Sequence, residues 1–319
     1  MAEWSNWAGN VTASPARIAT PETEAAIVQC VADAREHDLT VRVTGTGHSF
    51  MPVAATDGIA IDASGLSGVA RFETAASRAW IRAGSKLTTL GPALAAEGLA
   101  MENLGDIDVQ ALGGAIATGT HGTGPTLPNL SARVSGLRLI GADGELRVLR
   151  AEDDPEALEA ARVSLGVLGI VTAVRLDLVP TYRLRERIER IPVDEILESL
   201  AERIGATRHF EFFWYPQARR AEAKALDPTD APATAPQDEK GAPGGDRIGP
   251  SYEILPSERT QRFVEMEYAL PAAAGPDCFR AVRERLRSRH PEVAWPVEYR
   301  TLRADDAWLS PAHGRDTVT

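Results

Sequence analysis

The chain has 319 residues, of which 44% are hydrophobic and 25% charged, and its formal net charge is −11. This composition is typical of a globular protein with enough length for two cores, and the negative charge disfavours nucleic-acid and membrane-surface binding. No run of about 18 apolar residues and no secretory signal occurs, so we expect a cytoplasmic protein without a membrane span.

The first 180 residues predict helices alternating with short strands. A helix is expected over residues 20–37, with Thr20 as its cap, Pro21 in its first position and Ile27, Cys30, Val31 and Ala34 on one apolar face. Strand-like runs follow at 39–43, 58–62 and 78–84, and a helix containing Pro92 is expected over 84–98. Asp143–Gly144 predicts the turn of a hairpin over 134–150, and a helix near 153–164 and a strand at 169–180 complete this half.

The second half has a different character. Aromatic, strand-like runs occupy 209–216 and 262–271, and a helix over 277–291 and a strand over 293–303 follow them. Residues 226–250 are rich in Pro, Gly, Ala and Asp and predict a mobile loop. Since strands and helices mix without a strict repeat, an α+β fold is favoured over a doubly wound sheet. Pro180 is the predicted boundary between a domain of residues 1–180 and one of residues 181–319.

The stretch VRVTGTGHSF, residues 41–50, places His48 after two glycines at the end of a predicted strand. Gly45 and Gly47 allow a ligand to approach the main chain, and successive N–H groups in such a turn form an anion-binding nest. A plain glycine-rich turn with an incidental histidine is the alternative.

A second glycine-rich stretch covers residues 103–124, NLGDIDVQALGGAIATGTHGTG. Few packed cores need so many positions without a side chain, so this stretch predicts a long ligand lying against the main chain. Neither stretch fits GxxxxGK[ST], and no GxGxxG opens a helix after the first strand, which disfavours a Rossmann fold.

The two glycine-rich stretches, followed by GVLGIVTAVRLDLVP at 166–180, resemble the flavoprotein oxidases of the vanillyl-alcohol oxidase and p-cresol methylhydroxylase type. Within that type the chain looks most like the sugar-1,4-lactone oxidases and alditol oxidases. The resemblance implies a two-subdomain FAD-binding domain in residues 1–180 and an α+β substrate domain in 181–319. It also implies that the chain ends inside that second domain, before a His-Trp-Gly-Lys motif of the family.

The resemblance assigns the FAD contacts to both glycine-rich stretches. His48 would be joined covalently to the flavin 8-methyl group, with a non-covalent flavin contact as the alternative. His121 would line the dinucleotide, with a purely structural histidine as the alternative. The remaining FAD contacts implied are Thr44, Gly45, Thr46, Gly47, Ser49, Asp106, Gly114, Ala117, Thr118, Gly119, Gly122, Thr123, Gly169, Ile170 and Val171. Asp106 would also approach the substrate.

Glu298 and Arg300 are the predicted catalytic residues. Two positions apart on a strand, their side chains point to one face, and a carboxylate beside a guanidinium offers an acceptor and donors for substrate hydroxyls. A salt bridge of little consequence is the alternative. No metal site is expected, because no cluster of ligands at zinc spacing occurs.

The function implied by the resemblance is FAD-dependent oxidation of a CH–OH group of a D-arabinono- or L-gulono-1,4-lactone, by hydride transfer to flavin N5. Oxygen or another acceptor would then reoxidise the flavin. An alditol oxidase is the first alternative, and a catalytically incomplete flavin-binding fragment and a sugar-binding protein without flavin are the others.

Overall fold

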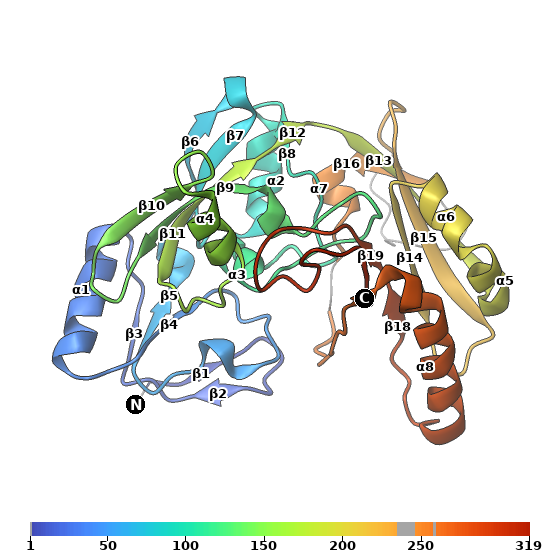
Figure 1. Cartoon of the computed structure of the whole chain (residues 1–319), viewed down its shortest axis with the longest axis horizontal. Coiled ribbons are helices and arrows are strands. Elements are labelled where there is room, and N and C mark those ends of the chain that lie inside the picture. Colours follow the sequence, from blue (N-terminus) through green and yellow to red (C-terminus); the bar gives the residue numbers. More distant parts are fainter. Residues whose placement is uncertain (1, 235–245, 258–259) are drawn as a thin grey trace.

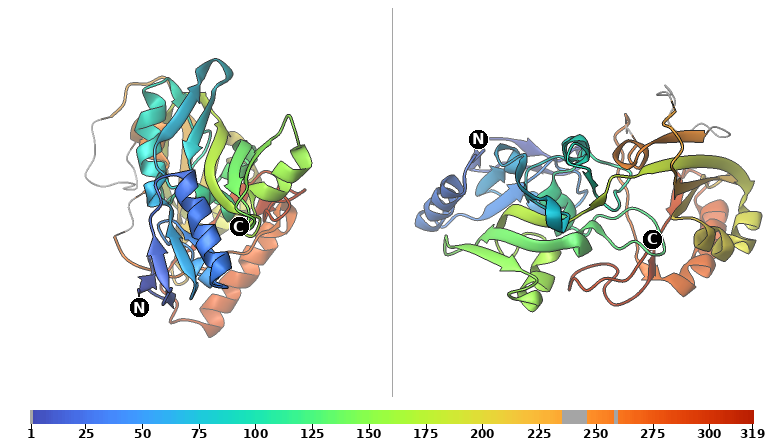
Figure 2. Two further views of the ribbon diagram at one scale, coloured as in Figure 1. Left: turned by 90° about the vertical axis from the view of Figure 1, so that its left-hand side faces the viewer. Right: turned by 90° about the horizontal axis from the view of Figure 1, so that it is seen from above.

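The computed structural model describes residues 2–234, 246–257 and 260–319, and it has two lobes (Figure 1). The first lobe (residues 2–180) contains the blue to green elements, and the second lobe (residues 181–302) contains the yellow to red ones. Residues 303–319 run back between the lobes, as Figure 1 and the right-hand view of Figure 2 show. In that segment Arg162 pairs with Asp306 at 2.6 Å, and Asn129 donates to Asp305 at 3.0 Å.

The N-terminal part of the first lobe is a small parallel sheet covered by one helix. Its strands lie in the order β3 (Arg17–Ala19), β5 (Ile59–Asp62), β4 (Val41–Thr44), and the helix is α1 (Glu24–Glu36). The predicted apolar face is confirmed, because Ile27, Cys30, Val31 and Ala34 pack with Ile59 and Ile61.

The predicted start of this helix is wrong. Thr23, and not Thr20, is the N-cap, and its Oγ1 accepts the N–H of Ala26 at 3.1 Å. Threonine caps a helix by accepting an N–H three residues onward, and Thr23 satisfies that spacing for a helix that begins at Glu24.

A five-stranded antiparallel sheet forms the rest of the first lobe. Its order is β10 (Leu146–Arg150), β9 (Val134–Ile140), β11 (Ile170–Asp177), β7 (Arg78–Arg82), β6 (Val69–Glu73). The predicted hairpin is confirmed, since β9 pairs with β10 and Gly144 has φ +83°. The helices of this part are α2 (Leu87–Ala95), α3 (Leu112–Ala117) and α4 (Pro155–Arg162).

The second lobe is built on another five-stranded antiparallel sheet. Its order is β16 (Asp246–Pro250), β13 (Arg183–Pro192), β15 (Arg220–Pro228), β14 (His209–Trp214), β18 (Val297–Tyr299). One face is apolar: Phe210, Phe212 and Trp214 pack with residues of α5 (Val193–Glu198), α6 (Leu200–Ala206) and α8 (Gly275–Arg289). The opposite face carries charged side chains, because side chains alternate along a strand.

Short elements complete the fold. The short strands are β1 (Trp4–Ser5) with β2 (Thr12–Ala13), β8 (Leu99–Ala100) with β12 (Val179–Pro180), and β17 (Leu270–Pro271), β20 (Thr317–Val318) and β19 (Thr301–Leu302) in one sheet. The short helices are α7 (Ser251–Ile254) and the 3-10 turns η1 (Pro52–Ala54), η2 (Ala63–Gly65), η3 (Thr74–Ala76), η4 (Leu130–Arg133) and η5 (Ala272–Ala274).

Two predictions for the second half need correction. Of the expected strand at 262–271, only Leu270–Pro271 forms one, and residues 262–269 pair with no strand of the described chain. The loop expected over 226–250 is shorter, because β15 continues to Pro228 and β16 begins at Asp246, where both pair with β13. The part of that loop at 235–245 lies outside the described residues.

The lobes are joined by main-chain hydrogen bonds and by a shared apolar core. Among the strands of the described ranges no ladder links the two lobes, but an isolated bridge connects Gly124 with Leu302, and Ser257 donates its N–H to the Asp106 carbonyl at 2.8 Å. Leu184, Leu226 and Ile254 of the second lobe pack into the core of the first. Of the helices described, none combines the length and apolar character that a bilayer span requires.

A buried histidine predicts loss of stability in acid. His209 in β14 is 0% exposed, and burial, helped by the charges of Arg208 and Lys224, lowers its pKa to about 3. The unfolded chain binds a proton below about pH 6.5 while the folded chain does not, so the free energy of unfolding should fall by roughly 1.4 kcal/mol per pH unit from pH 6.5 towards 3. Urea unfolding at pH 6.5, 5.5 and 4.5 should show this extra slope in the wild type and not in His209→Phe. The exposed His37 supplies the control His37→Phe, and equal slopes in all three proteins would contradict the assignment.

Candidate functional site

The loop after β4 is held by the N-terminal segment. Trp7 donates its N–H to the Gly47 carbonyl at 2.8 Å, and the side chain of Asn6 donates to the Ser49 carbonyl at 2.9 Å. Asn10 donates to the next carbonyl along the loop at 3.0 Å. Gly47 has φ +71°, a left-handed conformation that favours glycine. Sequence reasoning missed these two asparagines, because no local spacing links them to a loop some forty residues away.

The main-chain N–H groups of residues 46–50 donate no hydrogen bond within the part of the chain that the structure describes. Consecutive free N–H donors at a left-handed glycine form a concave anion site. The donor set therefore suits the diphosphate of a dinucleotide. Thr44 ends β4 opposite Asp62 of β5, and its buried Oγ1 donates to the Ile61 carbonyl at 3.3 Å.

His48 is the middle residue of this donor set, and its side chain is half-buried. Its ring stacks on Trp7, with centroids 4.9 Å apart and planes inclined by 22°. Burial lowers the pKa of His48, so its imidazole is neutral at neutral pH and keeps a nucleophilic nitrogen.

The two glycine-rich stretches are neighbours. A Cβ on Gly45 would lie 2.9 Å from the Cβ of Ala111, closer than carbon atoms can pack. Gly114 is the opposite case: it is exposed, and nothing lies within 4 Å of the position of its Cβ. The first loop, Ala111 and the open main chain at Gly114 therefore form one continuous surface.

Other glycines of the second stretch are required by main-chain packing, a reason that the argument from sequence did not consider. A Cβ on Gly122 would lie 2.2 Å from the Leu104 carbonyl oxygen, one on Gly105 3.0 Å from the His121 carbonyl oxygen, and one on Gly113 2.9 Å from the Cβ of Ala83. Gly105 and Gly122 thus let the main chain of the second stretch pack against itself, and Gly113 lets it pack against Ala83.

The loop at 163–169 meets the end of α3. Leu165 donates its N–H to the Ala117 carbonyl at 3.1 Å, and next to Ala117 lies the exposed Thr118. Ile170 begins β11 opposite Ile140 of β9, and Gly169 packs on that strand. The predicted contacts at 117–118 and 169–171 thus lie on adjoining segments. Gly119 packs against Pro311.

Thr123 and Gly124 of the first lobe form hydrogen bonds with the second lobe. Thr123 Oγ1 donates to the Phe210 carbonyl at 2.7 Å and accepts the Thr301 N–H at 3.2 Å. Gly124 donates its N–H to the Thr301 carbonyl at 2.9 Å. Thr123 is therefore a joint between the lobes, and it brings His121 beside Arg300.

Three linked side chains cross this joint: His121 and Arg300 each pair with Glu267. His121 is 6% exposed; its Nδ1 lies 2.7 Å from the Gly122 carbonyl and its Nε2 3.0 Å from Glu267. Arg300 pairs with the other oxygen of Glu267, and its Nε lies 3.4 Å from Glu298. Although burial opposes it, the contacts with His121 and Arg300 lower the pKa of Glu267 to about 2.

A second set of charges lies beside Glu298. Glu211 and Lys224 are opposite each other on β14 and β15, with Nζ 2.8 Å from Glu211 and 3.4 Å from Asp106. Oxygens of Asp106, Glu211 and Glu298 lie within 4.8 Å of one another, a spacing that could hold a metal ion. Lys224 supplies a positive charge there.

Burial raises the pKa of Glu298 to about 8, against the effect of Arg300, and the carboxylates of Asp106 and Glu211 add to the rise. Glu298 and Arg300 share one face, as their spacing predicts. Sequence reasoning missed Glu211, Lys224 and Glu267. The alternation in HFEFFW places Glu211 opposite the apolar face of β14, but the register with β15 and β18 is needed to bring it to Glu298.

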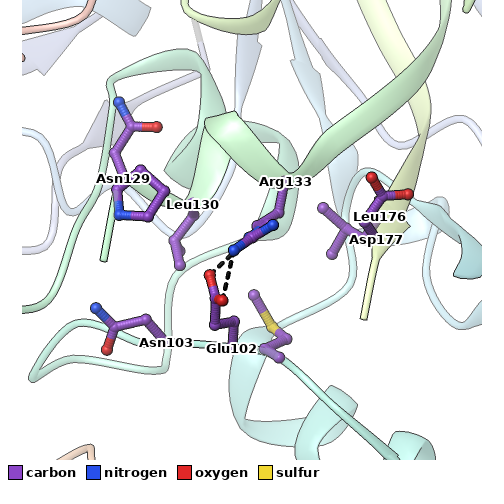
Figure 3. A pocket seen from close by; sticks show the side chains of 9 residues that line it. Glu102, Asn103, Asn129, Leu130, Arg133, Leu176 and Asp177 are labelled. Carbon is purple, nitrogen blue, oxygen red and sulfur yellow. Dashed lines mark hydrogen bonds and ion pairs between the residues drawn. The ribbon is translucent and has the colours of Figure 1, made fainter. Parts of the chain in front are cut away.

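A cavity behind residues 103–124 is too small for a substrate. It measures about 10 Å³, roughly the space of one water molecule. Figure 3 shows the Glu102 carboxylate facing Arg133 inside it, with Nε 2.6 Å from Glu102. This ion pair ties the start of the glycine-rich segment to η4.

Comparisons with known proteins cover nearly all of the chain. Residues 15–150 match the family model "FAD binding domain", and residues 174–244 and 239–319 match "D-arabinono-1,4-lactone oxidase". The chain is 35% identical to the L-gulono-1,4-lactone dehydrogenase of Mycobacterium tuberculosis (strain H37Rv), over 98% of this chain and 81% of that relative. It is 27% identical to the L-gulonolactone oxidase of Bos taurus, over 99% and 80%, and 30% identical to the alditol oxidase of Streptomyces sp., over 98% and 80%.

Among solved structures, cholesterol oxidase from B. sterolicum superposes with a TM-score of 0.85 at 18% identity, over 99% of this chain and 78% of that one. This likeness confirms the α+β fold expected from the sequence.

The contact between the two glycine-rich stretches predicts the effect of a single methyl group. Gly45→Ala should lower the free energy of unfolding by roughly 1–3 kcal/mol, because its Cβ would overlap Ala111 and the loops would have to separate. Gly205→Ala is the control, since nothing lies within 4 Å of that Cβ in α6 and alanine favours a helix. Urea unfolding measures both variants, and a Gly45→Ala variant as stable as the wild type would refute the contact.

Proposed function

The chain belongs to the family of FAD-dependent sugar-lactone oxidoreductases, and from this premise we propose that it oxidises a CH–OH group of a D-arabinono- or L-gulono-1,4-lactone. The observation that carries the proposal is the position of Glu298 and Arg300, which the Thr123–Thr301 contacts hold beside the glycine-rich surface of the first lobe. An alditol presents a similar row of hydroxyls in open form, and the alditol oxidase relative makes it the second candidate substrate.

The residues present fit FAD. The free N–H groups of 46–50 would hold its diphosphate, and the open main chain at Gly114 and the segments at 117–118 and 169–171 would line the rest. Asp106 is assigned to the charged face, since it pairs with Lys224. When bound, FAD supplies an acceptor for the two electrons of the substrate carbon, and oxygen or another oxidant takes them up afterwards.

Arg300 and Glu298 would bind and orient the substrate. The neighbouring carboxylates outweigh burial and raise the pKa of Arg300, so the guanidinium remains a cation with several donors. These donors would fix the oxygen of the reacting hydroxyl, as well as an oxygen on which negative charge develops. Once ionised, Glu298 would accept the proton of the reacting hydroxyl.

We propose that His48 carries the flavin covalently, on the evidence of its neutral, half-buried imidazole clamped by Trp7. Orientation of a nucleophile by fixed neighbours lowers the barrier to bond formation.

Acid denaturation tests this link. The yellow colour should stay with the precipitated wild-type chain and leave with the supernatant for His48→Ala. His37→Ala, on an exposed position next to α1, should behave like the wild type. Colour released from the wild type would exclude a covalent bond and leave non-covalent FAD binding.

The raised pKa of Glu298 predicts a pH profile. Because Glu298 acts as a base only when ionised, kcat/KM for L-gulono-1,4-lactone should rise with pH up to about 8 and then level off. Below that pH, the decline should be about tenfold per unit. Glu298→Gln should lose this limb and roughly 10²–10⁴-fold of the rate. The exposed Glu292 gives the control Glu292→Gln, and a Glu298→Gln variant that keeps the rising limb would contradict the role of Glu298.

A further inference from the structure

We propose that Lys224 is a positioning residue for this reaction: its ammonium group pairs with Glu211 and Asp106, fixes these two carboxylates beside Glu298, and sets the pH at which Glu298 releases its proton. The proposal rests on the proposed role of Glu298 as the proton acceptor.

The position of Lys224 is unusual for this sequence. The chain has 34 basic residues, of which only Lys86, Lys224 and Lys240 are lysines. Lys224 is 7% exposed, on the face of the sheet opposite to α5, α6 and α8, whereas Lys86 is exposed. A lysine is almost never buried unless it is paired, so its neighbours must account for its place.

Its neighbours are carboxylates from both lobes. Nζ lies 2.8 Å from Glu211, which is 2% exposed, and 3.4 Å from Asp106 on the loop of the first lobe. The charged groups that act on Lys224 and Glu298 are Asp106 of the 103–111 loop, Glu186 of β13, Glu211 of β14, and Arg300 after β18. Glu186 is itself held by Arg247, with Nε at 2.9 Å.

Three carboxyl groups within 4.8 Å of one another repel strongly where water is scarce. The ammonium of Lys224, 2.8 Å from Glu211 and 3.4 Å from Asp106, offsets this repulsion with a positive charge and so favours the ionised form of Glu298. Without it, the protonated form of Glu298 would be favoured further, and a higher pH would be needed to ionise it.

A lysine suits this place better than an arginine. Its ammonium is a compact point charge on a flexible stem, and it reaches between two carboxylates that belong to different segments. A guanidinium carries the same charge on a larger planar group. Because Lys224→Arg keeps the charge, it should preserve most of the effect of Lys224 on the pKa of Glu298. Lys224→Met has a similar length and no charge, so it should lose this effect.

The test is an infrared titration of the FAD-loaded protein without substrate, following the C=O band of the protonated carboxyl that Glu298→Gln removes. Lys224→Met should move the midpoint of this band upward by about one pH unit or more. Lys224→Arg should return the midpoint close to the wild-type value, and the control Lys86→Met should leave it unchanged. The rising limb of kcat/KM for L-gulono-1,4-lactone should move in parallel.

An unchanged midpoint in Lys224→Met, or an equal shift in Lys86→Met, would overturn the proposal. If Lys224→Met does not fold, Glu211→Gln and Glu211→Gln/Lys224→Met give the same comparison with one carboxylate fewer. An upward shift between these two supports the proposal, and no shift overturns it. Because the titration needs no turnover, a protein that shifts as expected but oxidises no lactone would refute the proposed function alone.

Discussion

The structure depends on a short junction between its lobes. Gly124 and Thr301 share a main-chain hydrogen bond of 2.9 Å, and Thr123 Oγ1 links two strands of the second lobe to the first. Buried hydrogen bonds of this kind contribute only about 1 kcal/mol each, but leaving their groups unpaired costs more. The junction therefore favours one arrangement of the lobes, together with the apolar core that Leu184, Leu226 and Ile254 share with the first lobe. It places His121 within 3.0 Å of Glu267, and through Glu267 it joins the glycine-rich segment to Arg300.

The charged face follows from this junction and from the sheet of the second lobe. One side of that sheet is covered by helices, so the alternation of side chains sends Glu211, Lys224 and Glu298 to the other side, where the first lobe covers them. Charges taken out of water are stable only with partners, and here Asp106 comes from one lobe and Lys224 from the other. The same burial that requires partners also perturbs proton affinities. A reaction that must remove a hydride and a proton from one CH–OH group needs a group of this kind, with a pKa near working pH.

Local chemistry made a large part of the fold predictable. The apolar face of α1 and the Asp143–Gly144 hairpin follow from spacing and turn preference, whereas the exact cap at Thr23 depended on where the helix begins. The turn around His48, with its free N–H groups, could be predicted because its glycines and the histidine are adjacent in sequence. The charged face was readable only in part, because Lys224 and its partners meet through strand register and lobe packing, which no local pattern encodes. Glycine content was also ambiguous, since main-chain packing at Gly122 requires a glycine whether or not a ligand lies there.

In the proposed enzyme, the substrate binds to Glu298 and Arg300 on the charged face, and the lobe junction holds that face beside the proposed FAD-binding surface. A crystal structure of the chain grown with FAD and L-gulono-1,4-lactone measures this directly. We expect the diphosphate on the N–H groups of residues 46–50, the ring next to His48, and lactone hydroxyls within hydrogen-bond distance of Glu298 and Arg300. Lactone bound away from these two side chains, with their ion pair unchanged, would contradict the account.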